Sequence, residues 1–463
     1  MSPQNYWTLL PSELVLSVLI YLHPKDVSSF SMTSSFFRDL VYSTNDTYLW
    51  RQLMLCRFDD PRRSYPLVSA GPSSTPPEID WKTKVQERTN AEIIAFCDHG
   101  DATKHERKRQ QALETFVSIA TDAPPFGNGE PSLNLSWLDR VLRESKFLRS
   151  PCLPTELQLC SQLRAQLTLT HENGDSEEDR LILKTRRTQS RCYVYDFRRY
   201  NRYNDWGPFL PDGNVNWVHV ESMINVILMN LRELPDACIT TLPPLGLEAT
   251  RAFSAPGTFR NEDWAGVEGT WRRYVSFMDY RDLFAFNYSN IASGPRNPSF
   301  FQDSRFCEAT RLIEVKLHLI SPDELSFSRY EFHSSYTQHV HNPRYPTLYF
   351  AGTTRGLNGR EADIEGYVRI AADGTVRWKF FRESPIVAIP NGGKYNRHTL
   401  SESILTASSG KSSHGVQVGN IRSAMGILGN YSTADHDEGD PVGPFWLYKV
   451  PDDFNGKLLE NLL

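Results

Sequence analysis

The sequence has 463 residues, of which 40% are apolar and 12% aromatic, and its formal net charge is −5. This composition is typical of a globular protein with two or three domains, and it excludes a disordered chain or one drawn to nucleic acid or an anionic membrane by overall charge. No apolar run of about 18 residues occurs, so no helical transmembrane segment is predicted.

The N-terminal stretch and the cysteines indicate the compartment. The first residues have no basic segment before the apolar run, so we expect no secretory signal. The seven cysteines are scattered without a CxxC pair, and the closest two are Cys152 and Cys160. This spacing favours reduced thiols over a disulfide framework or a zinc module. We therefore expect a cytoplasmic and/or nuclear protein without a metal.

The N-terminal region predicts three short helices. Ser12 is a candidate N-cap for a first helix over 13–22, a second helix is expected over 25–32, and Ser34 or Ser35 can cap the third. The first helix is apolar over most of its circumference, and a segment of about 45 residues cannot bury that surface alone. We expect a docking module whose surplus apolar surface is covered by something else.

The order of residues in this region resembles the F-box, which has a Leu-Pro-x-Glu-Leu opening, a Pro-x-Asp pair, a Ser before its third helix and a terminal Trp. The matching residues are Leu10, Pro11, Glu13, Leu14, Leu22, Pro24, Asp26, Ser34, Leu40 and Trp50. Residues 35–38 depart from the pattern, because many members carry a basic residue and then an aromatic one there. The alternative is an ordinary helical cap whose leucines belong to the core.

The resemblance implies that residues 5–56 pack on the Skp-type adaptor of a cullin–RING ubiquitin ligase, while the rest of the chain selects a protein substrate. The residues that it implies at the adaptor surface are Leu10, Pro11, Leu14, Leu19, Leu22, Pro24, Val27, Leu40 and Trp50.

After this region, Pro- and Ser-rich residues 57–79 predict a linker, and residues 80–180 predict a helical connector. A rigid connector would hold the recognition domain at a fixed distance from the adaptor. The basic cluster at 104–109 is interpreted as the solvated face of a helix rather than a nuclear-localisation or nucleic-acid patch. The acidic stretch 171–179 predicts a mobile loop.

Residues 181–258 form a mixed segment leading into the last domain. The alternation in 191–197 predicts a strand, and 215–234 predicts a helix. Between them, the arginine- and aromatic-rich segment 198–213 either binds nucleic acid by stacking and phosphate contacts or is pinned to the protein body by its aromatic side chains. The net charge favours the second interpretation.

From 259 to 455, short aromatic-rich segments separated by turn signals predict an antiparallel β domain. The expected strands are Trp271–Met278, Phe284–Tyr288, Arg311–Ile320, Tyr330–Phe332, Leu348–Ala351, Glu365–Ile370, Val376–Phe381, His414–Val418, Met425–Tyr431 and Phe445–Val450. The clearest hairpin turns at 372–375. Because closure removes exposed edges, we expect a barrel or a sandwich. The fold class is therefore α+β, with a three-helix F-box, a helical connector and a C-terminal antiparallel β-barrel or sandwich.

A second resemblance covers most of residues 190–450. The blocks 193–221, 266–287 and 427–450 are similar to fungal F-box proteins whose C-terminal half forms a β-barrel. The architecture is also similar, more distantly, to animal F-box-only proteins with a β-barrel, and no substrate residues are transferred from that distance.

Catalytic and metal motifs are incomplete. Ser409-Gly410-Lys411-Ser412 has Leu405 where a phosphate-binding loop requires glycine, and Lys411 is expected in a loop. The acidic turn 436–440 and the pair His339 and His341 lack a full set of metal ligands. We expect no enzyme activity, no metal and no cofactor.

Recognition is the remaining function. Arginine forks suit capture of carboxylate or phosphate groups, and the candidates for contact with a protein substrate are Arg272, Arg281, Arg344 and Arg355. The alternative for each is surface charge paired with a neighbouring aspartate.

We therefore expect a substrate receptor of an SCF-type ubiquitin ligase, whose partners are the adaptor, a cullin–RING complex and an unidentified protein, without nucleic acid or membrane. One alternative is a small-molecule-binding barrel with an F-box docking module, which a lumen filled by Trp271, Phe277, Phe286 and Trp446 would exclude. Another is an F-box protein that acts with the adaptor outside a ligase.

Overall fold

The computed structural model divides the chain into two compact units, residues 1–163 and residues 164–463, and each is described by itself. The residues that it describes are 10–43, 47–64, 78–97, 106–127, 129–172, 174–234, 241–258, 260–288, 296–303, 306, 308–326, 343–356, 359, 361–382, 410–437 and 439–454.

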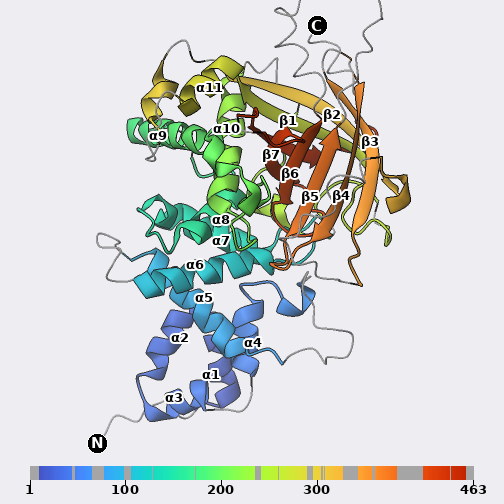
Figure 1. Ribbon diagram of the computed structural model, residues 1–463. Coiled ribbons are helices and arrows are strands. Elements are labelled where there is room, and N and C mark those ends of the chain that lie inside the picture. Colours follow the sequence, from blue (N-terminus) through green and yellow to red (C-terminus); the bar gives the residue numbers. More distant parts are fainter. Residues whose placement is uncertain are drawn as a thin grey trace, which may run out of the picture. The chain divides into compact units, whose positions relative to one another are not determined.

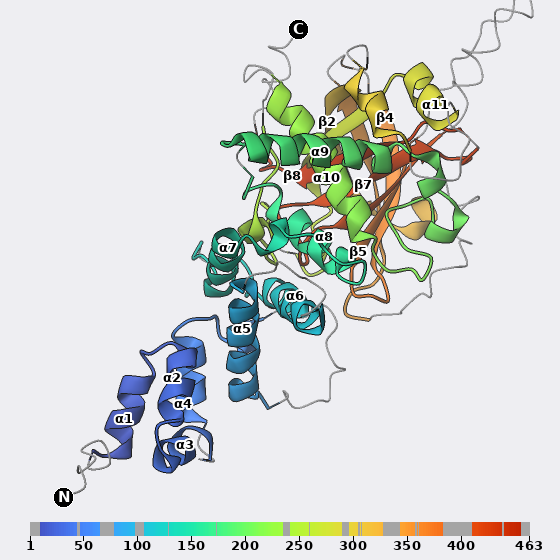
Figure 2. The ribbon, with the colours of Figure 1, turned by 90° about the vertical axis from the view of Figure 1, so that its left-hand side faces the viewer.

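The first unit is helical. It begins with α1 (Ser12–Leu19), α2 (Pro24–Ser31), α3 (Ser35–Tyr42) and α4 (Tyr48–Leu55), labelled in Figures 1 and 2. It continues with α5 (Trp81–Ala95), α6 (Glu106–Thr121), α7 (Leu133–Ser145) and α8 (Leu157–Leu167), the last of which crosses the boundary between the units.

Local capping explains where the first helices begin. Ser34 caps α3 by accepting a hydrogen bond from the Phe37 amide at 3.2 Å, as the sequence predicts. The prediction that Ser12 caps the first helix is wrong, because Ser12 is already helical and Pro11 occupies the N-cap position. The region also has one helix more than expected, since the residues around Trp50 form α4.

A buried ion pair joins α6 to the turn before α8. Arg109 Nε lies 3.0 Å from Glu156 Oε1, and both side chains are fully buried. The interpretation of residues 104–109 as a solvated face is therefore wrong for Arg109, while Arg107 and Lys108 are exposed. The helix turns Arg109 inward beside Leu113 and Phe116, which are buried at helical spacing after it.

The second unit opens with α9 (Glu177–Val194) and α10 (Trp217–Glu233). The strand predicted over 191–197 is wrong, because α9 continues to Val194 and a 3₁₀ turn follows at Phe197–Arg199. The acidic stretch expected as a loop contributes the first turn of α9, where Ser176 accepts a hydrogen bond from the Asp179 amide. Carboxylates in the first turn are stabilised by the partial positive charge at a helix N-terminus.

The rest of this unit confirms the barrel. Its strands are β1 (Gly269–Met278), β2 (Glu308–Ile320), β3 (Leu348–Gly356), β4 (Glu361–Ile370), β5 (Val376–Arg382), β6 (Lys411–Gln417), β7 (Ile427–Thr433) and β8 (Gly443–Lys449). Each strand pairs antiparallel with the next, and β8 pairs with β1 to close the barrel (Figure 1). The predicted hairpin at 372–375 joins β4 to β5.

One of the expected strands is a helix, and another lies outside the described residues. Phe284–Tyr288 is wrong as a strand, because these residues belong to the helix α11 (Tyr280–Tyr288) that follows β1. Its aromatic side chains at positions 280, 284 and 288 recur every four residues and form an exposed row. Tyr330–Phe332 lies outside the described residues, as does the pair His339 and His341.

Side chains alternate between the lumen of the barrel and its outer face. Trp271, Phe350 and Trp378 lie together in the lumen, with the two indole rings 5.7 Å apart. Gly366 is required there, since a Cβ atom on it would lie 2.0 Å from the Lys379 carbonyl oxygen and 2.6 Å from the Phe350 ring. On the outer face, α10 packs against β7 and β8 (Figure 2), and Trp446 belongs to the apolar cluster that it forms there.

Among the described helices, none is both long enough and apolar enough to cross a membrane.

Candidate functional site

The N-terminal helices expose an unusual amount of apolar surface. Leu10 is 42% exposed, Leu14 55%, Val18 52% and Tyr21 80%. These residues recur at intervals of three to four, which places them on one side of α1 and its flanking turns. We call these four side chains the α1 stripe. A contiguous exposed apolar patch of this kind marks an interaction surface.

The opposite side of α1 builds the core of the region. Val15 and Leu19 are each 2% exposed and pack with residues of α2, α3 and α4. The sequence predicts surplus apolar surface on the N-terminal helices. Part of it is buried by the chain itself, because Trp81 and Val85 of α5 belong to the same cluster. What stays open on α1 is the stripe.

The nine residues expected at the adaptor surface therefore fall into different environments. Leu10, Pro11 and Leu14 are exposed, while Leu22 and Leu40 are half-buried against the core. The other four, Leu19, Pro24, Val27 and Trp50, are buried in the region's own fold. For these four the structure corrects the expectation of an open surface, because their side chains hold the helices together. Val18 and Tyr21 were missed, although the four-residue spacing from Leu14 to Val18 points to them.

Polar contacts fix the shape beneath the stripe. Arg57, which follows α4, donates to the carbonyl oxygen of Leu22 at 2.6 Å and to that of Ile20 at 3.4 Å. These carbonyls lie at and just after the C-terminal end of α1, where no further helical turn supplies N–H donors to them. The end of α1 is thus fastened to α4, and the stripe is presented on a braced helix.

The arginines proposed for substrate capture do not converge. Arg272 is buried on the outer face of the barrel and lies 2.7 Å from Glu314, and Arg355 occupies the position on β3 across from the same glutamate. Arg281 is exposed beside Asp279 at 3.5 Å, and Arg344 lies over the Tyr345 ring at 5.3 Å. For Arg272 the expectation of an open capture site is corrected, since burial and its ion pair make it structural.

Four other cations do meet, at the end of the barrel where β1 and β5 finish and β6 begins. Arg273, Arg311, Arg382 and Lys411 line a pocket of about 300 Å³, which we call the mouth pocket. Arg273 and Arg311 lie on adjacent strands, and Arg382 pairs directly with Lys411. Lys411 is the first residue of β6, so the expectation that it lies in a loop is wrong. The signal in the sequence was the alternation of Trp271, Arg273 and Val275, but only the strand register brings the four together.

Burial and the charges of neighbouring cations lower the pKa values of Arg273 and Lys411. Burial and the charge of Arg382 lower the pKa of Arg273 to about 9, although Tyr431 opposes the shift. Burial, followed by the charges of Arg382, Arg273 and Arg311, lowers the pKa of Lys411. With a pKa of about 9, Arg273 stays charged at neutral pH. The mouth pocket is thus a concentrated region of positive charge.

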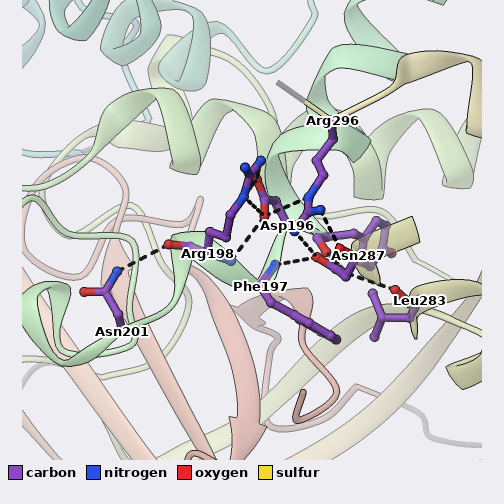
Figure 3. Close-up of polar contacts among 8 residues, drawn as sticks. Asp196, Phe197, Arg198, Asn201, Leu283, Asn287 and Arg296 are labelled. Atoms are coloured by element: carbon purple, nitrogen blue, oxygen red, sulfur yellow. Dashed lines mark hydrogen bonds and ion pairs between the residues drawn. The ribbon is translucent and has the colours of Figure 1, made fainter. Parts of the chain in front are cut away.

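The arginine-rich segment after α9 is fastened to the barrel unit. Figure 3 shows Arg198 and Arg296 reaching the buried Asp196, at 2.7 and 3.2 Å. Burial raises the pKa of Asp196, but hydrogen bonds from Arg198 and the charge of Arg296 outweigh it, so its pKa lies below the usual value. Asn287 of α11 accepts a hydrogen bond from the Phe197 amide at 2.9 Å. These contacts support the interpretation of residues 198–213 as a pinned segment.

Aromatic contacts fasten the later part of segment 198–213 to the barrel unit. Phe209 is buried in the apolar cluster beneath α10, and Arg377 lies over its ring at 4.4 Å. Trp206 stacks on His436 with the ring centroids 4.2 Å apart. His436 therefore belongs to a packed turn, and Asp440 accepts a hydrogen bond from the Asp437 amide at 2.7 Å.

Within the described part of the chain, one group of side chains is close enough to share a metal ion. Cys152, Glu156 and Cys160 place their ligand atoms within 4.8 Å of one another. Both carboxylate oxygens of Glu156 already accept hydrogen bonds from Arg109, at 3.0 and 3.2 Å. The ion pair with Arg109 accounts for the buried charge of the Glu156 carboxylate, so no metal ion is needed to explain it.

Comparison with known families identifies the first region. The family model described as F-box-like matches residues 7–56, which span α1 to α4 and the α1 stripe. No curated protein and no solved structure matches the chain. The similarity of the C-terminal half to fungal F-box proteins thus stays a prediction. The chain carries an F-box at residues 7–56 and is, by that domain, an F-box protein.

Proposed function

We propose that this protein is the substrate-recognition subunit of an SCF-type ubiquitin ligase. The α1 stripe carries the proposal, because an F-box domain leaves four large apolar side chains exposed on its first helix and flanking turns. Burial of such a surface against the Skp-type adaptor provides the binding free energy, at about 25 cal/mol per Å² of apolar area removed from water. The adaptor then links the chain to a cullin–RING complex.

The β-barrel is the proposed site of target recognition, and the chain contributes no catalytic step of its own. A barrel that closes on itself offers loops and a mouth at its ends, where ligands of other barrels bind. The helices between the F-box and the barrel are proposed to set the distance from adaptor to target. As an adaptor-bound receptor, the protein would act in the cytoplasm and/or nucleus.

A capture experiment with the full chain tests this role. Wild-type protein and a Leu14→Asp/Val18→Asp variant are used as bait in cell extract under proteasome inhibition. The adaptor and a cullin should be recovered with wild type and lost with the variant, while targets held by the barrel are recovered with both. Recovery of the adaptor without a cullin would instead support a role outside a ligase, and loss of every partner would point to misfolding of the variant, which its helical circular dichroism reports.

A second candidate function, a small-molecule-binding barrel with an F-box, is favoured by the mouth pocket. Of the four aromatic residues whose packing would fill the lumen, Trp271 lies within it and Phe277 lines the mouth pocket. Phe286 lies on α11 and Trp446 faces α10, so neither occupies the lumen.

A further inference from the structure

Among the residues that the structure describes, the mouth pocket collects positive charge with no acidic side chain in its lining. Arg273, Arg311, Arg382 and Lys411 line it, and none of its described lining residues is an aspartate or glutamate. The nearby Glu308 is already engaged outside the pocket by Arg191 and by the Tyr195 hydroxyl. Burying like charges together costs free energy unless an anion compensates them. Such an arrangement is typical of a binding site.

The buried member of the set has unused hydrogen-bonding capacity. Arg273 is 9% exposed, and its Nη2 donates to Ser413 Oγ at 2.9 Å while its Nε has no hydrogen-bond partner among the described residues. Its guanidinium lies 4.1 Å from the centroid of the Phe445 ring. Ring stacking fixes the direction of the arginine fork before any ligand arrives, which lowers the entropy lost on binding.

An aromatic ring also supports a second arginine, at the rim of the pocket. Arg311 lies over the Phe277 ring at 4.6 Å. The Ser413 hydroxyl accepts from Arg273 and can still donate to a ligand. The hydroxyls of Tyr431 and Thr433 also line the pocket, but they already donate to the Ser276 carbonyl at 3.3 Å and to Asp440. Ile364 and Phe380 add apolar surface to the lining. The pocket therefore offers charge and donors on one side and apolar contact on the other.

We propose that the mouth pocket binds a phosphate monoester attached to a small apolar or aromatic group. A phosphate monoester carries a charge of about −1.5 to −2 at pH 7 and three acceptor oxygens, which suits several converging cations better than a single carboxylate does. The pocket volume of about 300 Å³ is at the small end of the range for ligand sites and fits one such group. If the ester is carried by a target protein, this inference rests on the proposed function, and if it is a free small molecule, it extends the second candidate.

Calorimetric titration of the full chain tests the site. The probes are phenyl phosphate, inorganic phosphate, benzoate and a short peptide bearing phosphotyrosine. Phenyl phosphate should bind about tenfold or more tightly than benzoate, because each tenfold corresponds to about 1.4 kcal/mol and charge-assisted bonds to a dianion supply more than that. Binding of the peptide at least as tight as phenyl phosphate would assign the ester to a protein side chain, and exclusion of the peptide would assign it to a small molecule.

Variants at the exposed rim keep the test independent of folding. Arg311→Gln and Lys411→Gln should each weaken phenyl phosphate about tenfold. Lys316→Gln is the matched control, since Lys316 lies on β2 with Arg311 but on the outer face, and it should bind as wild type. Equal binding of benzoate and phenyl phosphate, or unchanged affinity in both rim variants, would overturn the proposal. The proposed adaptor surface lies in the first unit and the mouth pocket in the second. A failure of phosphate binding would therefore leave adaptor binding unchanged, and failure of this inference can be distinguished from failure of the proposed function.

Discussion

The indole nitrogen of Trp50 donates a hydrogen bond to the backbone carbonyl of Val41 at 3.0 Å. This bond ties α4 to the end of α3, and the Trp50 ring also packs against Tyr42 at 5.7 Å. Trp50 thus holds α3 and α4 together, and in the proposed receptor it would support adaptor binding indirectly, through the fold of the F-box.

Replacing Trp50 tests its structural role in α3 and α4. Trp50→Phe keeps most of the apolar contact but loses the bond to Val41, and it should lower the local stability of α3 and α4 by about 1 kcal/mol. Trp50→Ala should lower it by about 3–5 kcal/mol, because a large cavity is left in the core. Amide hydrogen exchange of residues 35–43 and 48–55 measures both. Unchanged exchange in Trp50→Ala would show that the ring is not a structural support.

The buried pair of Arg109 and Glu156 makes a second stability prediction. Arg109→Met removes one partner and leaves the Glu156 carboxylate buried without its counter-ion, which should destabilise the first unit by about 3–5 kcal/mol. The matched control is Arg140→Met, because the Arg140 side chain is 48% exposed and its pair with Glu92 should contribute at most about 1 kcal/mol. Urea unfolding followed by helical circular dichroism compares the two variants, and equal losses would contradict the assignment.

Acid should weaken the second unit through His219. This side chain is buried on α10 against the Tyr200 hydroxyl at 3.0 Å, and burial, followed by the charge of Arg199, lowers its pKa to about 3. The unfolded chain takes up a proton near pH 6.5 and the folded chain does not. The free energy of unfolding should therefore fall by about 1.4 kcal/mol per pH unit as the pH drops from about 6 toward 3.

His219→Gln should flatten this dependence. The difference between wild type and variant isolates His219 from the other buried histidines, whose contributions cancel. Denaturant unfolding at pH 7, 5 and 4 measures it. Parallel pH profiles for the two proteins would show that His219 is not the group responsible.

Phosphate binding at the mouth pocket should depend on pH in two directions. Below about pH 6 the ester takes up its second proton and loses charge, so affinity should fall. At alkaline pH, affinity should fall again because two cations lose their protons early. The pKa of Arg273 is about 9, and burial and the charges of Arg382, Arg273 and Arg311 lower the pKa of Lys411. Calorimetry with phenyl phosphate from pH 5 to 10 tests this. Affinity that keeps rising with pH would contradict the role of Lys411.

The sequence predicted the parts whose information is local. The proline, serine and tryptophan order of the F-box and the turn at 372–375 depend on neighbouring residues, and both are found. Residues 191–197 and 284–288 were mistaken for strands because aromatic alternation over a few residues cannot be distinguished from a short helix that packs on one side.

The mouth pocket depends on information that is not local. Arg273 and Lys411 are more than a hundred positions apart in the chain, and only the closed register of the barrel brings them to one end. The same limit applies to Arg109, whose partner Glu156 lies on another element. Residue type alone cannot distinguish Arg272, which was predicted as a candidate, from its neighbour Arg273, which was not. Arg272 faces Glu314 on the outer face, and Arg273 lines the mouth pocket.

The most direct test of the proposed receptor is the affinity of the purified full chain for a purified Skp-type adaptor. Three proteins are titrated: wild type, Leu14→Asp on the α1 stripe, and Ile93→Asp, which alters an exposed apolar side chain of α5 away from the stripe. We predict that wild type and Ile93→Asp bind equally and that Leu14→Asp binds at least about a hundredfold more weakly, since a buried unpaired charge costs several kcal/mol. Equal affinity of Leu14→Asp and wild type, or no adaptor binding by wild type, would contradict the assignment.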